Sequence, residues 1–186
     1  MKAIDKNQLV DTLENKVENH LQQAIQVFQN LGPGRLLQPA ANGGWSIAQC
    51  LEHLNSYGHF YLPYLQSGLA QSKGKPAAPT FQSTWLGSYF TRTMDPETGK
   101  KKYKAMKGYI PVPDLDAAAV VAEFIQQQET LLACLIQSRQ ADLNDIKIPI
   151  SISRWIKLRL GDVLQFLIAH NERHLQQAKR NLVDGY

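Results

Sequence analysis

Cysteine is scarce in this chain, and long apolar runs are missing. Cys50 and Cys134 are the two cysteines among 186 residues, and each lies within a helical pattern. Two such thiols cannot build a disulfide framework, so we expect buried free cysteines. Apolar stretches fall short of the roughly 20 residues that span a bilayer, and residues 1–10 lack the apolar centre of a signal peptide. We therefore expect a cytoplasmic protein that does not enter the membrane.

The composition is that of an ordinary globular domain. Hydrophobic residues make up 44% of the chain and charged residues 19%, which predicts one domain over residues 1–186. The net charge of +4 comes mostly from the lysines of residues 100–107. We expect this segment to be a solvated loop, with an anion-binding rim as the alternative. Nucleic acid binding is disfavoured because these charges do not follow one helix face.

Four segments show the apolar period of amphipathic helices. The first ends at Gly32-Pro33-Gly34, a combination that interrupts helices. The second begins at Ser46, where Gln49 three residues later completes a capping box. The four segments cover residues 6–31, 46–67, 117–138 and 160–183.

The chain between the second and third segments loses this period. Residues 71–116 contain several prolines and glycines, with a short helix expected at 85–91. Connections of this length are uncommon in compact domains and often carry function. Residues 144–159 are extended in character. The pattern predicts an all-α four-helix bundle with one long connection, and a bundle with a small hairpin is the alternative.

Three histidines occupy positions that the helical period assigns to the core. His170 and His174 lie one turn apart on the inner face of the last helix, and His53 lies on the inner face of the second. Burying an imidazole without partners costs a few kcal/mol, roughly. A shared cation is the simplest explanation, since side chains one turn apart can both reach an ion at about 2.0 to 2.1 Å.

A three-histidine site would leave coordination positions open, as catalytic metal sites do. Zinc and nickel suit these ligands best, with iron and cobalt as further alternatives. For each histidine taken alone, a hydrogen bond to a carbonyl or a tyrosine is the more common role. The metalloprotease pattern is absent, because Asn171 and not glutamate follows His170.

Other polar residues are weaker candidates. His20 could be a fourth ligand, although a position on the flank of the first helix is favoured. Tyr57 could donate a hydrogen bond to a metal-bound species, but aromatic residues at this spacing more often pack. Arg154 and Arg173 could bind a substrate carboxylate, a role that surface arginines rarely have.

Two motifs resemble the DinB-like superfamily. They are Trp45-Ser46-Ile47-Ala48-Gln49-Cys50-Leu51-Glu52-His53-Leu54 and His170-Asn171-Glu172-Arg173-His174-Leu175-Gln176-Gln177. The resemblance implies a four-helix bundle with a long crossover between helices 2 and 3, a divalent metal bound by His53, His170 and His174, and a homodimer. The chain departs from the family at Arg159, where threonine is common, so a helix cap is expected to be lost or shifted.

The resemblance leaves the reaction open. Relatives include thiol transferases that use bacillithiol, an isomerase that uses mycothiol, and proteins assigned as metal-dependent hydrolases without a known substrate. Our leading hypothesis is an enzyme whose metal activates a low-molecular-weight thiol or water for transfer to, or hydrolysis of, a small-molecule substrate. The alternative is a stress-related bundle protein that binds metal or another ligand without turnover.

Overall fold

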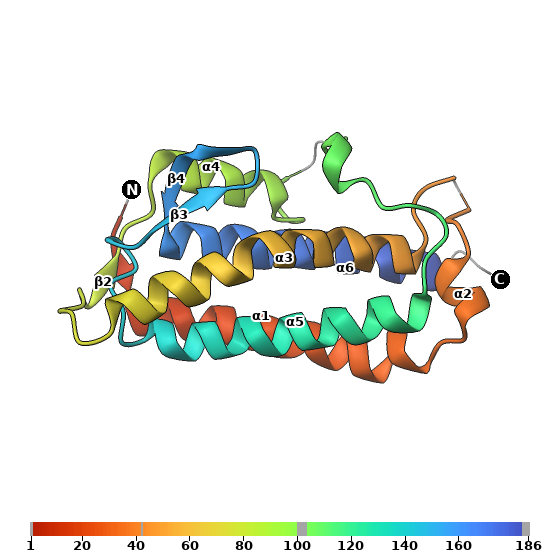
Figure 1. The fold of residues 1–186 in the computed structure, drawn as a ribbon, viewed down its shortest axis with the longest axis horizontal. Coiled ribbons are helices and arrows are strands. Elements are labelled where there is room, and N and C mark those ends of the chain that lie inside the picture. Colours follow the sequence, from red (N-terminus) through yellow and green to blue (C-terminus); the bar gives the residue numbers. More distant parts are fainter. Residues whose placement is uncertain (1, 42, 100–103, 184–186) are drawn as a thin grey trace.

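Four long helices lie side by side in the computed structural model, which describes residues 2–41, 43–99 and 104–183 (Figure 1). The helices are α1 (Lys6–Gln26), α3 (Ile47–Ser72), α5 (Ala117–Ser138) and α6 (Leu160–Val183). The sequence predicts α5 and α6 with these same bounds. Shorter helices are η1 (Phe28–Asn30), α2 (Pro33–Leu37), α4 (Trp85–Met94) and η2 (Lys107–Tyr109).

Side-chain caps begin three of the long helices. The predicted capping box at α3 is confirmed: Ser46 Oγ accepts from the Gln49 amide at 3.1 Å, and Gln49 Oε1 accepts from the Ser46 amide at 3.0 Å. Asp5 caps α1 and Asp116 caps α5 in the same way. Such caps satisfy amides that have no partner within the helix.

The start of α6 explains the departure at Arg159. The first amides of this helix, those of Leu160 and Gly161, donate to the carbonyls of Ile146 and Leu143 at 2.9 and 3.2 Å. Backbone carbonyls of the segment just before β3 thus satisfy two amides that a side-chain cap would otherwise serve. The Arg159 side chain instead donates a hydrogen bond to the Gln82 carbonyl at 2.6 Å.

Two expected helix ends were wrong. The first helix ends at Gln26, and residues 28–30 form a tighter turn before Gly32. Pro33 then begins α2, because proline is favoured at the first position of a helix, where no amide is needed. The second helix continues past residue 67 to Ser72 and accommodates Pro63.

Small sheets correct the all-α prediction to a mostly helical fold. β1 (Ile4–Asp5) pairs antiparallel with β2 (Thr80–Phe81), and β3 (Lys147–Ile150) pairs antiparallel with β4 (Ser153–Arg159). The second pair is the hairpin that the sequence offered as the alternative. It forms because Ile148, Ile150 and Leu158 bury one face against the bundle.

The long connection returns along the bundle. Figure 1 shows α3 and α5 running in the same direction, so the chain between them must travel back over the length of the helices. On the way α4 packs against α6, where Asp162 is fully buried. Its carboxylate accepts from the Thr84 hydroxyl at 2.7 Å, from the Thr84 amide and from the Ser83 hydroxyl. Gly87 lies so close to Asp162 that a Cβ there would overlap the carboxylate.

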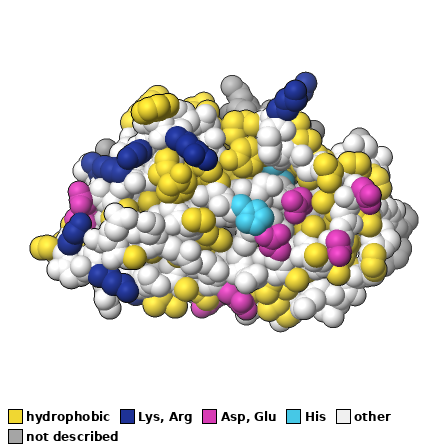
Figure 2. Space-filling view, viewed as in Figure 1, with side chains coloured by type: hydrophobic (Ala, Val, Ile, Leu, Met, Phe, Trp, Pro, Cys, Tyr) yellow, Lys and Arg dark blue, Asp and Glu magenta, His cyan; other side chains and the backbone are white. Residues whose placement is uncertain are grey.

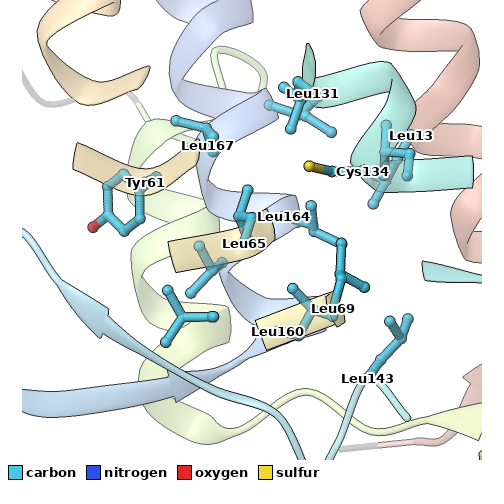
Figure 3. Close-up of a cluster of buried hydrophobic side chains, with 14 of the residues drawn as sticks. Leu13, Tyr61, Leu65, Leu69, Leu131, Cys134, Leu143, Leu160, Leu164 and Leu167 are labelled. Atoms are coloured by element: carbon cyan, nitrogen blue, oxygen red, sulfur yellow. The ribbon is translucent and has the colours of Figure 1, made fainter. Parts of the chain in front are cut away.

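Two clusters of buried hydrophobic residues form the core. The larger packs Leu65, Leu69, Leu164 and their neighbours between the helices and the hairpin (Figure 3). The other contains Phe28, Leu51 and Leu175 and lies toward the C-terminal ends of α1 and α6. Cys50 and Cys134 are buried free thiols, as predicted, and burial raises their pKa values to about 12 and about 11.

Removing the Asp162 carboxylate tests how α4 is held against α6. Replacing Asp162 with alanine removes three hydrogen bonds to the start of α4 and should lower the free energy of unfolding by about 3 kcal/mol. Urea unfolding measures the change. Asp114→Ala, at an exposed position of the same connection, should stay within about 0.5 kcal/mol of the parent. Equal unfolding midpoints for the two variants would contradict the assignment.

Candidate metal centre

The structure brings His53, His170 and His174 together. His53 comes from α3, and the other two lie one turn apart on α6. One ring nitrogen of each lies within 4.8 Å of the others, a spacing that could hold a metal ion. The Nε2 atoms of His53 and His170 are 3.2 Å apart, and the three ring centroids are separated by 4.6 to 5.0 Å.

Neighbouring groups orient two of the imidazoles. His53 Nδ1 donates to the Tyr109 carbonyl at 2.7 Å, so its Nε2 keeps a lone pair directed at the cluster. His174 Nδ1 bonds to Gln177 Oε1 at 3.0 Å, which leaves Nε2 as the second lone-pair nitrogen. The Trp45 ring covers both, with centroids 4.9 Å from His53 and 5.8 Å from His174. The rings are therefore fixed before any ligand binds.

His170 is buried and closely packed. Its Nδ1 finds no hydrogen-bond partner among the residues that the structure describes. The ring is packed between Tyr57, at 4.3 Å between centroids, and Phe166, at 5.8 Å. His170 Nε2 hydrogen-bonds to His53 Nε2 at 3.2 Å, and a cation among the three rings would replace this bond and accept the nitrogen lone pairs. The donor set therefore fits a divalent metal.

Burial keeps these histidines neutral. It lowers the pKa of His170 well below the usual range, with further lowering by His174 and His53. Burial likewise lowers the pKa of His174, to about 3, and that of His53, where the bond to Tyr109 offsets part of the effect. A metal ligand must be the unprotonated imidazole, which these rings are at neutral pH.

The three histidines lie on the wall of a cavity of about 1390 Å³. Residues of α3, α4, α6, the hairpin and the long connection contribute to its lining. Hydrophobic side chains gather on the molecular surface above the hairpin and α4, with basic side chains among them (Figure 2). The cavity is large enough for a small molecule beside the histidines.

The other candidates have different roles. His20 is neither a fourth member of the cluster nor on a flank: it is fully buried, and its Nε2 bonds to Glu172 Oε2 at 2.8 Å. Glu172 faces α1 because it lies half a turn from His170 and His174, and the bond to His20 lowers the Glu172 pKa to about 2. Tyr57 packs against the cluster, as noted above.

The two candidate arginines do not present a common carboxylate site. Arg173 lines the cavity, but its Nη1 donates to the carbonyls of Thr93 and Gly99 at 3.2 and 2.9 Å. It thereby ties the end of α4 to α6. Arg154 is exposed on the hairpin. In the lysine segment, Lys100 to Lys102 lie outside the described residues, while Lys104 contributes to the cavity wall.

Sequence reasoning missed the groups that orient the imidazoles. Trp45 lies in one of the quoted motifs, so a role near His53 could have been suspected. Tyr109 belongs to the aperiodic connection, and nothing in its sequence indicated which helix it would contact. Gln177 lies one turn after His174, a spacing that could have suggested the observed bond.

Fold and site together define a helical bundle with a candidate three-histidine metal centre in a cavity. The chain belongs to the DinB superfamily, whose family model matches residues 16–178. It is similar in structure to YfiT from Bacillus subtilis, described as a probable metal-dependent hydrolase with an unusual four-helix bundle topology. The TM-score is 0.51 and the identity 17%, over 95% of this chain and 85% of that one.

A comparison with curated proteins found no match. No helix in the described ranges is long and apolar enough to cross a membrane.

The neutral histidines predict how stability depends on pH. Below about pH 6.5 the unfolded chain takes up protons on its histidines, whereas folded His174 resists protonation down to about pH 3. The free energy of unfolding of the metal-free protein should therefore fall as the pH falls below about 6.5, by up to about 1.4 kcal/mol per unit for each such histidine. His174→Gln should reduce this slope in urea unfolding at several pH values. Parallel slopes for parent and variant would contradict the burial argument.

Proposed function

We propose that this protein is a metal-dependent enzyme in which His53, His170 and His174 bind a divalent cation. The observation that carries the proposal is the convergence of three neutral ring nitrogens within 4.8 Å on a cavity wall. Zinc or nickel suits such a ligand set. The resemblance to YfiT, named as a probable metal-dependent hydrolase, supports a hydrolytic reaction.

The bound cation would lower the pKa of a coordinated water or ionise a coordinated thiol, supplying a nucleophile at neutral pH. The chain's own residues prepare the site for this. Tyr109 fixes the tautomer of His53, and Gln177 orients His174. Trp45 shields both rings on one side, so the nucleophile would face the cavity.

The choice between water and a thiol is a second question. A low-molecular-weight thiol with acidic groups would find basic side chains in the cavity wall, Lys104 and Arg180 among them. Water needs no such contact. The proposal therefore includes both hydrolysis and thiol transfer. Binding without turnover is the alternative. The cytoplasmic location and the homodimer also stay predictions.

Metal binding itself can be measured directly. Protein produced without a histidine tag and stripped with a chelator should take up one Zn²⁺ or Ni²⁺ per chain in a calorimetric titration. His170→Ala removes one of three ligands and should weaken binding at least roughly 100-fold. His59→Ala is the matched control, because His59 is exposed and pairs with Glu123. Unchanged affinity in His170→Ala would exclude the assigned centre.

Activity assays test the chemistry. The metal-loaded protein is offered 4-nitrophenyl acetate, and separately monochlorobimane with glutathione or bacillithiol. Turnover of the ester supports activation of water, and conjugation supports activation of a thiol. In either case His170→Ala should lower kcat/KM by roughly 100-fold or more, since the nucleophile is no longer generated. A metal-bearing protein that is inert toward both kinds of substrate supports the binding alternative and overturns the enzymatic proposal.

A further inference from the structure

The cavity differs on the two sides of the histidines. Phe166 lies one turn before His170 on α6, and Tyr57 and Tyr61 lie one and two turns after His53 on α3. This side faces α4 and the hairpin. On the other side, beyond His174, α6 contributes Gln177 and Arg180. One end of the cavity is therefore aromatic and the other is polar and basic.

We call the first end the aromatic chamber and define it by six lining residues, Tyr61, Phe90, Ile150, Ser151, Leu158 and Phe166. Phe166 links its members: the ring centroid is 5.9 Å from Tyr61, 6.1 Å from Phe90 and 5.8 Å from the imidazole of His170. These separations are those of favourable aromatic contacts. The chamber wall therefore continues without a break to the candidate metal centre.

A cluster of hydroxyl groups interrupts this apolar wall. Tyr61 Oη accepts from the Ser151 amide at 3.1 Å and donates to Ser151 Oγ at 3.4 Å. Figure 3 shows the Tyr61 hydroxyl directed away from the leucines of the core. Tyr57 lies one turn before Tyr61 on the same cavity wall, with the two ring centroids 6.3 Å apart. The Tyr61 and Ser151 hydroxyls thus meet at the hairpin turn, on the cavity wall that also holds the histidines.

These groups specify the chemistry of a ligand. The six residues of the chamber carry no charge, so an ionic group placed there would lose its hydration without compensation. Aromatic and aliphatic walls favour a ring-bearing apolar body. The hydroxyl cluster can exchange its mutual bonds for one to a ligand oxygen, because hydroxyl groups rotate and both donate and accept.

We propose that the aromatic chamber binds the apolar, ring-bearing body of an uncharged small molecule, with one oxygen of that molecule hydrogen-bonded to the Tyr61 and Ser151 hydroxyls. As an assignment of substrate class this rests on the proposed function, since the adjoining part of the molecule would then reach the metal held by the histidines. The binding itself does not require the metal.

Two fluorescent probes that differ by one hydroxyl test the proposal. 2-Naphthol and naphthalene are titrated against the metal-stripped full-length protein. The parent should bind 2-naphthol more tightly than naphthalene. Ser151→Ala should weaken 2-naphthol binding roughly fivefold, the value of one hydrogen bond, and leave naphthalene binding unchanged. Phe90→Ala should weaken both probes roughly fivefold or more, and Phe90→Leu serves should the alanine variant fail to fold.

Trp155→Ala is the control, because Trp155 lies on the same hairpin with its side chain in solvent and should affect neither probe. Failure of both probes to bind the parent, or equal 2-naphthol affinity in parent and Ser151→Ala, overturns the chamber. Probe binding that responds to these variants in a protein without metal affinity would instead support the chamber and refute the metal centre. The two failures are therefore distinguishable.

Discussion

The packing of α3 against α6 fixes the distance between His53 and the two histidines of the last helix, and the candidate site depends on it. Imidazoles are poor core residues unless their nitrogens are satisfied. Here they lie where the two apolar clusters meet, with leucines on either side along both helices. A sliding of one helix by a single turn, about 5.4 Å, would separate the nitrogens beyond the reach of one ion. The hydrophobic clusters on both sides oppose such a shift, because closely packed buried side chains would lose contacts if one helix slid past the other.

The long connection also contributes to the site. Its Tyr109 carbonyl accepts a hydrogen bond from His53 Nδ1, and Arg173 ties the end of α4 to α6. The buried Asp162 secures the other end of α4. Helices bring the three imidazoles together, and the connection decides which nitrogen His53 presents and supplies part of the cavity wall.

The sequence predicts what is local and periodic. Spacing along one helix placed His170 and His174 on one face, and capping chemistry located the start of α3 at Ser46. Contacts between distant segments left no such pattern. The His20–Glu172 pair joins residues 152 positions apart, and the helical period only placed His20 near the edge of a stripe. The hairpin was the second choice because residues 144–159 give little strand signal. The contact of His53 with His170 and His174 was predicted only because a four-helix bundle was assumed.

The histidines and the aromatic chamber are built by different elements of the fold. The three histidines come from the long helices, which the fold holds in fixed register. The aromatic chamber is closed by α4 and by Ile150, Ser151 and Leu158 of the hairpin, elements added to the bundle. Connections tolerate changes in sequence and length better than packed helices do. Chemistry at the histidines can therefore persist while the hairpin and α4 change the shape and polarity of the chamber, so that substrate choice is separable from nucleophile activation.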